Sequence, residues 1–239
     1  MKKYIPNFLT LMNLLCGCLA IGNAYENNLI QVAILIAGSL LFDFFDGMAA
    51  RLLKVHSEIG KQLDSLADVV SFGVVPGIVA AKLMLNALES TDNHYNFIFA
   101  FVLLFIPYII PLFSALRLAK FNIDTRQTDS FIGVPTPTNA ILWVSLPLIL
   151  EHDKYNLSFI ILNPIILVIL ILLTSYLLVA EIPLFALKFK NLKWSENKIR
   201  FIFIILSVIL IPVFMFAAIP LIIFLYVVLS LLNNLKLIK

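Results

Sequence analysis

The chain has 239 residues, of which 62% are hydrophobic and only 13% are charged, and its mean hydropathy is +1.02. This composition excludes an ordinary soluble domain, in which about a quarter of the residues are charged. The net charge of +3 is small, so no nucleic-acid partner is expected. The basic residues are better explained by membrane topology.

Long apolar runs predict an all-α polytopic membrane protein, because a helix needs about 20 apolar residues to cross a bilayer. These runs are too long and too continuous for the alternating short strands of a membrane barrel. The last run, 201–235, is too long for one span, and Pro212 and Pro220 bracket a plausible reversal within it,. We therefore expect a single integral-membrane domain over 1–239. It would have about eight transmembrane helices, at 8–25, 29–52, 65–88, 95–119, 136–150, 157–180, 200–214 and 217–235.

The distribution of Lys and Arg predicts the orientation of the chain. If both termini face the cytoplasm, fifteen of the seventeen basic residues lie on the cytoplasmic side,. These include Lys2 and Lys3 at the start and Lys236 and Lys239 at the end. We expect a multi-pass protein of the cell membrane in which the acidic residues described next face the cytoplasm.

The second and third predicted helices each carry a polar face. In the second helix, two carboxylates and two small residues are spaced i, i+3, i+4 and i+7, which places them on one side. In the third, two carboxylates at i and i+4 follow a glycine by one turn. The short connection, 53–60, predicts that the helices are antiparallel neighbours whose acidic faces meet. The residues are Asp43, Asp46, Gly47 and Ala50 in the second helix, and Gly60, Asp64 and Asp68 in the third.

Four carboxylates cannot stay ionised close together in a medium of low dielectric constant without compensation. Arg51 alone supplies too little positive charge. A ligand set of oxygen atoms without His or Cys fits Mg²⁺ or Mn²⁺, which commonly bridge carboxylates to phosphates. The competing interpretation is a solvated acidic rim at the membrane surface. Ionisable groups at this depth in a membrane protein usually mark a functional site, so the metal site is favoured.

The spacing D-x2-D-G-x2-A-R-x8-G-x3-D-x3-D resembles the signature of the CDP-alcohol phosphotransferases, and every fixed position is present. The resemblance implies a six-helix catalytic core that binds a CDP-linked lipid and one or two divalent ions, in a homodimer. It implies that Asp43, Asp46 and Asp64 are metal ligands, and that Asp68 is the general base and a further metal contact. The residues implied to contact the CDP-lipid are Gly47, Ala50, Arg51, Gly60, Asn7 and Thr10.

Three further segments, 6–17, 115–122 and 131–137, resemble the membrane-integral bacterial phosphatidylserine synthases within this family. The implied substrates are CDP-diacylglycerol and L-serine, and the implied products are phosphatidylserine and CMP. In relatives that use glycerol 3-phosphate, an Arg is expected where Asn13 stands. Glycerol 3-phosphate or an inositol compound remains the alternative acceptor.

Serine is a zwitterion, so its site needs a cation for the carboxylate and an acceptor for the ammonium group. Arg117 and Lys120, at the end of the fourth predicted helix, are the candidate partners of the carboxylate. Their competing interpretation is topology and contact with lipid headgroups. Asn122 follows in the next loop with Arg126 and Asp129; it is a third acceptor-binding candidate, and a solvated loop residue is the alternative for all three. Glu181 is a candidate with an interfacial role as its alternative.

Two other classes of membrane protein also place clustered carboxylates within the membrane to bind cations. Intramembrane prenyltransferases carry a second Asp-rich cluster, which this chain lacks after Asp68. A cation transporter would place its carboxylates near the middle of the bilayer on discontinuous helices, whereas these are predicted at one face. Both alternatives are therefore disfavoured.

Overall fold

The computed structural model describes residues 4–55, 57–90, 96–124, 130–187 and 193–235. Helices dominate this part of the chain, as the sequence predicts, and two three-residue strands are the only β-structure within it. In chain order the elements are α1 (Tyr4–Tyr25), α2 (Leu29–Leu53), α3 (Glu58–Asp68), the π-helical η1 (Val69–Val74), α4 (Val75–Ser90), α5 (Phe97–Phe105), η2 (Ile106–Tyr108), α6 (Ile109–Ile123), β1 (Ser130–Ile132), α7 (Thr136–His152), α8 (Ser158–Ile161), α9 (Pro164–Val179), β2 (Pro183–Phe185), α10 (Trp194–Phe214), η3 (Met215–Ala217) and α11 (Ala218–Asn234).

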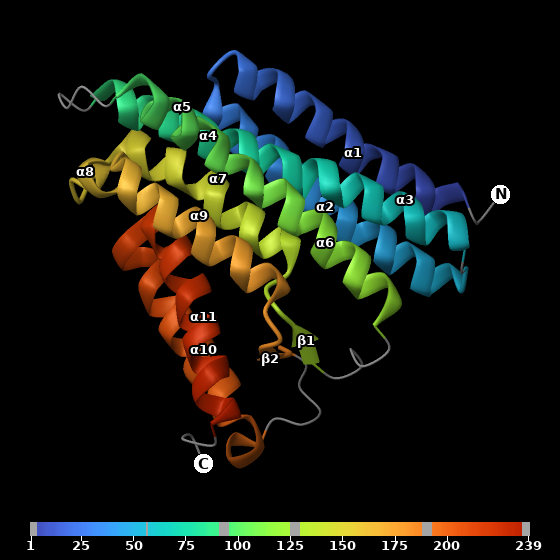
Figure 1. The fold of residues 1–239 in the computed structure, drawn as a ribbon. Coiled ribbons are helices and arrows are strands. Elements are labelled where there is room, and N and C mark those ends of the chain that lie inside the picture. Colours follow the sequence, from blue (N-terminus) through green and yellow to red (C-terminus); the bar gives the residue numbers. More distant parts are fainter. Residues whose placement is uncertain (1–3, 56, 91–95, 125–129, 188–192, 236–239) are drawn as a thin grey trace.

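The helices up to α9 form a slanted bundle, and α10 and α11 form a hairpin beside it at a different inclination (Figure 1). α1 lies against both α2 and α3, while α7 packs against α2 and α4. The largest fully buried side chains, among them Trp143 and Phe72, lie in the core formed where these helices meet. The bundle therefore holds α1, α2 and α3 together at one edge.

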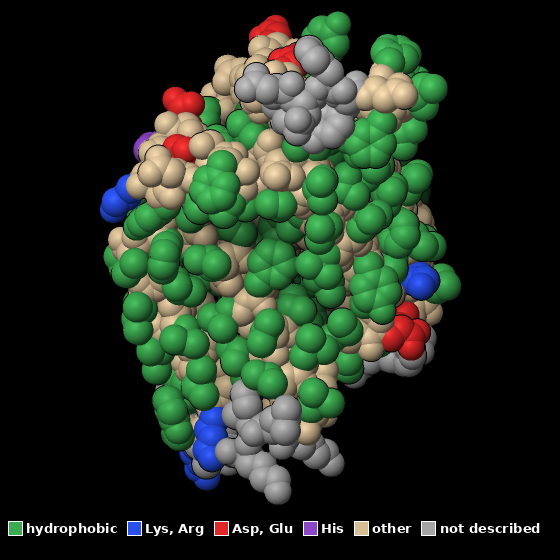
Figure 2. Space-filling model, turned by 60° about the vertical axis from the view of Figure 1, so that its left-hand side comes forward, with side chains coloured by type: hydrophobic (Ala, Val, Ile, Leu, Met, Phe, Trp, Pro, Cys, Tyr) green, Lys and Arg blue, Asp and Glu red, His purple; other side chains and the backbone are tan. Residues whose placement is uncertain are grey.

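The surface is typical of a protein embedded in lipid. Within the described residues, five helical runs are long and apolar enough to cross a membrane. The face in Figure 2 is covered largely by apolar side chains, and the charged side chains lie at its ends and along its edges. One of the five runs, Asn197–Asn234, contains the reversal between α10 and α11, where Met215 has a φ of 51°. The prediction of a reversal between Pro212 and Pro220 is confirmed.

The exact number of spans and the position of the termini stay predictions. The described helices α7 and α9 have 17 and 16 residues, which is short for a full crossing. Lys2, Lys3, Lys236 and Lys239, on which the predicted orientation partly rests, lie outside the described residues.

The third helical run begins earlier than the sequence predicts. It starts at Glu58 rather than at 65, because the Ser57 hydroxyl caps its first turn by accepting from the Gly60 amide at 3.2 Å,. The helix therefore includes Gly60 and Asp64, which the predicted span of 65–88 leaves outside. α2 ends at Leu53 and is capped by Lys54, whose φ of 52° is left-handed and whose N–H donates to the carbonyls of Ala50 and Arg51.

The two strands and the C-terminal hairpin brace the end of the bundle below α6 and α9. β1 pairs antiparallel with β2, Ser130 opposite Phe185. The Tyr226 hydroxyl of α11 donates to the Phe185 carbonyl at 2.7 Å, and Arg200 Nε of α10 donates to the Ala186 carbonyl at 2.8 Å. The hairpin thus fixes the chain that follows α9.

Gly17 allows α1 to approach the π-helical η1. A Cβ atom at Gly17 would lie 3.1 Å from Cα and 3.2 Å from Cβ of Ser71, closer than ordinary van der Waals contact. At Gly22 on the same helix, a Cβ atom would meet nothing within 4 Å. Close packing of α1 on η1 therefore requires glycine at position 17.

Gly17→Ala should destabilise the protein and Gly22→Ala should not. The added methyl at position 17 forces α1 away from η1, which costs about 1–3 kcal/mol. At position 22 only the gain in helix propensity, about 1 kcal/mol, remains. Thermal unfolding in detergent should show a lower Tm for Gly17→Ala and an unchanged or higher Tm for Gly22→Ala. Equal shifts in both variants would contradict this description of the α1–η1 contact.

Candidate functional site

Three of the four aspartates converge in the structure. One carboxylate oxygen from each of Asp43, Asp64 and Asp68 lies within 4.8 Å of the others. Asp43 comes from α2, and the other two come from α3, one turn apart. The predicted meeting of the two acidic faces is therefore observed. Both helices pack chiefly on α1, which makes α1 the third side of the cluster.

Asp46 lies beside this group, with its side chain directed at α1. Its Oδ2 accepts a hydrogen bond of 2.6 Å from Thr10 Oγ1, and it is only 7% exposed. The charge of Asp46 still interacts with those of Asp43 and Asp64. Thr10 Oγ1 also lies 3.1 Å from the Pro6 carbonyl, which fixes the hydroxyl between α1 and α2.

A second contact from α1 reaches Asp68. Nδ2 of Asn13 donates to Asp68 Oδ1 at 3.1 Å, and Asn13 is fully buried. Sequence reasoning used Asn13 only as an indicator of the acceptor and missed this contact. The available signal was the three-residue spacing of Asn7, Thr10 and Asn13, which places polar groups along one side of an otherwise apolar helix.

A pocket of about 300 Å³ opens beside the aspartates between α1, α2 and the start of α3. Five of the six residues expected at the CDP-lipid line it. The exception is Arg51, which is exposed and donates from Nε to the Gly47 carbonyl at 3.0 Å. Lys61 lines the pocket as well and was not predicted. The lining residues are Pro6, Asn7, Thr10, Asp46, Gly47, Ala50, Val55, Ser57, Gly60, Lys61 and Asp64.

The small residues keep this pocket open. A Cβ atom at Gly47 would meet nothing within 4 Å, so the space in front of this residue is free. A Cβ atom at Gly60 would lie 3.0 Å from Asn7 Oδ1, so a side chain there would collide with α1. A larger residue at Gly47 would therefore fill the pocket, and one at Gly60 would deform its wall.

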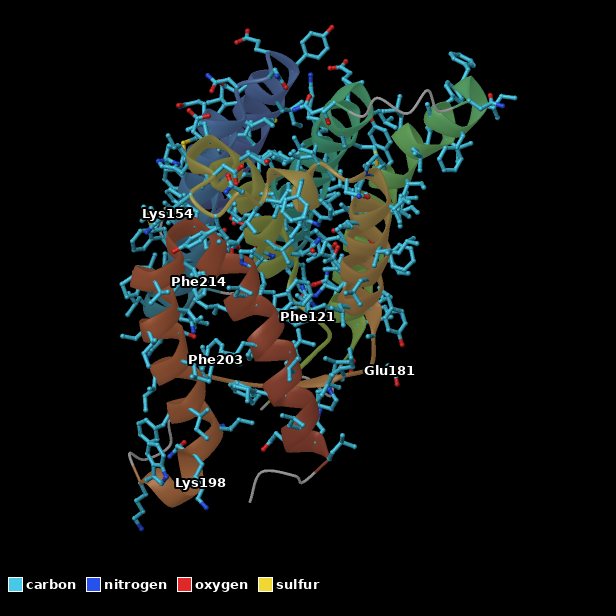
Figure 3. All side chains as sticks on the ribbon, turned by 90° about the vertical axis from the view of Figure 1, so that its left-hand side faces the viewer. Phe121, Lys154, Glu181, Lys198, Phe203 and Phe214 are labelled. Carbon is cyan, nitrogen blue, oxygen red and sulfur yellow. The ribbon has the colours of Figure 1, made fainter. Side chains whose placement is uncertain are left out.

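A second pocket, of about 340 Å³, lies where α6 and α9 end. Arg117 and Lys120 line it, as does Glu181. Figure 3 shows Phe121 and Glu181, which border this pocket, near the same end of the bundle. Arg117 is only 8% exposed, its guanidinium lies 5.2 Å from the centre of the Phe121 ring, and its charge interacts with that of Asp68.

Asn122 does not line either pocket. Its Nδ2 donates to Ser65 Oγ at 2.8 Å, and its carbonyl accepts from Lys61 Nζ at 2.8 Å. It therefore ties the end of α6 to α3, between the two pockets. The neighbouring Arg126 and Asp129, which the sequence places in the same loop, lie outside the described residues.

The aspartate cluster fits a divalent cation. Its ligand atoms are all carboxylate oxygens, which Mg²⁺ and Mn²⁺ prefer. Oδ1 of Asp64 is buried without a hydrogen-bond partner among the described residues, and a buried acceptor without a partner is costly. A cation would satisfy this oxygen and offset the repulsion between the carboxylates.

Comparison with known proteins identifies relatives over most of the chain. Residues 3–176 match the family model described as CDP-alcohol phosphatidyltransferase. A Bacillus subtilis (strain 168) protein named CDP-diacylglycerol–serine O-phosphatidyltransferase is 37% identical over 180 residues, which covers 75% of this chain and 89% of that protein. A Helicobacter pylori protein of the same name is 31% identical over 215 residues, covering 85% and 80%. An archaetidylserine synthase of Methanothermobacter thermautotrophicus is 30% identical over 159 residues, covering 65% and 63%.

Proposed function

The chain belongs to the CDP-alcohol phosphatidyltransferase family, and on this premise we propose that it transfers the phosphatidyl group of CDP-diacylglycerol to the hydroxyl of L-serine. The products are phosphatidylserine and CMP. The observation that carries the proposal is the convergence of three aspartates beside a pocket lined by most of the residues expected at the CDP-lipid. The names of the serine-using relatives support the choice of acceptor.

Members of this family depend on metal ions in general, and we assign the ion here to Mg²⁺ or Mn²⁺. Asp43 and Asp64 would hold it from the converging group, Asp46 would join them from its position beside that group, and Asp68 would be a further contact. Bound there, it would supply charge that makes the pyrophosphate a better electrophile and CMP a better leaving group. Thr10 holds Asp46 in place from α1.

Other residues of the chain would bind the CDP-lipid and accept the proton of serine. The pocket beside α1 receives the CDP end of the lipid, where Gly47 and Ala50 leave room for the cytidine phosphate. Asp68 accepts the proton of the serine hydroxyl while the serine oxygen attacks the phosphorus bonded to diacylglycerol. The bond from that phosphorus to CMP breaks in the same displacement.

The pocket at the end of α6 receives serine. Arg117 is buried at its wall, with Nε lacking a hydrogen-bond partner among the described residues. A buried guanidinium is a strong partner for a carboxylate. Lys120 adds a second positive charge at the same wall.

We also propose that the site faces the cytoplasm of the cell membrane and that the enzyme is a homodimer. The basic residues near both pockets, among them Lys54, Lys61 and Lys120, support the orientation,. This side is also where water-soluble serine and CMP are exchanged. The dimer is supported by family membership alone.

The metal site predicts that Asp43→Asn and Asp64→Asn each abolish CMP release without unfolding the protein. Each removes a ligand charge from the cluster, so Mn²⁺ binding should be lost together with turnover. EDTA should inhibit the wild type reversibly. Glu58→Gln, which removes an exposed acid from the first turn of α3, is the control and should retain both. Near-normal turnover of Asp64→Asn in metal-stripped buffer would show that the ligand assignment is wrong.

The acceptor assignment predicts that L-serine supports faster CMP release than glycerol 3-phosphate or inositol. Arg117→Ala should raise the KM for serine about tenfold or more and leave the KM for CDP-diacylglycerol nearly unchanged, because only serine loses its carboxylate partner. Lys154→Ala, which removes a cation next to Tyr155 beyond the end of α7, should change neither. Faster turnover with another alcohol would overturn the acceptor, and unchanged KM values in Arg117→Ala would overturn the role of this residue.

Asp68→Asn should separate binding from chemistry. The amide keeps the shape of the side chain but cannot take a proton, so turnover should fall by about 10²–10⁴-fold. CDP-diacylglycerol should still bind the variant in detergent, because the other aspartates keep their positions. Glu151→Gln, at the C-terminal end of α7, is the matched control and should keep full activity. Parallel loss of substrate binding and turnover would make Asp68 chiefly a metal ligand.

A further inference from the structure

Asn13 of α1 takes part in four hydrogen bonds with other described helices, and the proposed reaction gives it no role. It is fully buried on a helix whose other buried residues are mostly small, such as Gly17, Ala20 and Ala24. A buried amide of this kind is costly unless its donors and acceptors are satisfied. Its partners lie on two other helical elements, α2 and the α3–η1 run, and one of them is Asp68.

The hydrogen bonds hold the Asn13 amide in one orientation. Nδ2 donates to Asp68 Oδ1 at 3.1 Å, and Oδ1 accepts from the hydroxyl of Ser39. An ionised carboxylate only accepts hydrogen bonds, so the NH₂ group of Asn13 must face Asp68. Ser39 can then satisfy the amide oxygen, and its hydroxyl also lies 3.1 Å from the Asn13 carbonyl.

The backbone around Asn13 is fixed as well. The hydroxyl of Ser71 donates to the Asn13 carbonyl at 3.1 Å. Ser71 stands in η1, the π-helical segment that begins directly after Asp68, and π-helical turns occur frequently at functional sites. Gly17, one turn further along α1, allows this close approach. Asn13 and Asp68 are therefore held together at both the backbone and the side chain.

We propose that Asn13 is a positioning residue that orients the Asp68 carboxylate for proton transfer, an inference that rests on the proposed role of Asp68 as base. Its amide occupies Oδ1 and leaves Oδ2 for the incoming proton. Because the amide is neutral, it fixes the carboxylate without cancelling the negative charge that makes it a base. A residue that only filled space between α1 and η1 would need no donor toward Asp68.

The test compares Asn13→Ala with Asn13→Asp. Alanine removes the donor, and aspartate keeps the size of the side chain and the acceptor for Ser39 but places a second carboxylate against Asp68. We expect kcat to fall about 10–100-fold in Asn13→Ala, the usual cost of removing a hydrogen-bond partner of a site carboxylate. It should fall further in Asn13→Asp, while the KM for CDP-diacylglycerol stays within about twofold. Ser39→Ala, which frees the amide to rotate, should lower kcat in the same direction.

Asn23→Ala is the matched control, because Asn23 lies on the same helix and its side-chain amide donates to the Leu19 carbonyl rather than to an aspartate. It should leave kcat unchanged. Electron paramagnetic resonance of added Mn²⁺ gives a readout independent of turnover. Half-saturation should stay within about threefold of wild type in Asn13→Ala, because Asp43, Asp46 and Asp64 still hold the ion.

The outcomes separate this inference from the proposed function. Unchanged kcat in Asn13→Ala, or an Asn13→Asp variant as active as the wild type, overturns the positioning role, since shape alone would then suffice. Loss of Mn²⁺ binding in parallel with kcat also overturns it, because Asn13 would then act on the metal site. If the wild type releases CMP with another alcohol rather than serine, the acceptor is wrong, and the same variants are compared with that alcohol.

Discussion

The structure depends on keeping four carboxylates close together at the edge of an apolar bundle. Burying one ionised carboxylate without partners costs several kcal/mol, and mutual repulsion adds to that cost. The chain compensates part of it with neutral donors from α1, namely Thr10 toward Asp46 and Asn13 toward Asp68. The rest is left for a cation, as the partnerless oxygen of Asp64 indicates. The same carboxylate oxygens that would bind the cation therefore lower the stability of the fold when no cation is bound.

One pocket borders the cluster directly, and hydrogen bonds between α3 and α6 lie between it and the pocket at the end of α6. Lys61 lines the pocket proposed for the nucleotide and donates to the Asn122 carbonyl, while Asn122 donates to Ser65. These bonds join the first turns of α3 to the end of α6, which carries Arg117. A displacement at phosphorus needs nucleophile and leaving group on opposite sides of the reacting atom. Two separate pockets, as proposed for nucleotide and serine, meet this requirement better than one shared cavity.

Sequence reasoning predicted the cluster because its signal is local. The spacing of Asp43 from Asp46 and of Asp64 from Asp68 determines which helical faces they share, and a short connection brings those faces together. The start of α3 at Glu58 was missed, although Ser57 two residues after Val55 is a capping signal,. The π-helical turn after Asp68 and the pairing of β1 with β2 have no such signal. They arise from contacts between residues far apart in the chain, as between Ser71 and Asn13 or between Phe185 and Tyr226.

The role of α1 shows why a signature alone describes the site incompletely. All the fixed positions of the pattern lie on α2, on α3 or between them, yet both helices pack chiefly on α1. Two of the four carboxylates take their orientation from hydrogen bonds donated by α1. A helix that presents donors at a spacing of three residues, next to a glycine that permits close approach, can position carboxylates that it does not itself carry. In this chain the geometry of the four carboxylates is therefore set as much by the packing of α1 as by the residues of the signature.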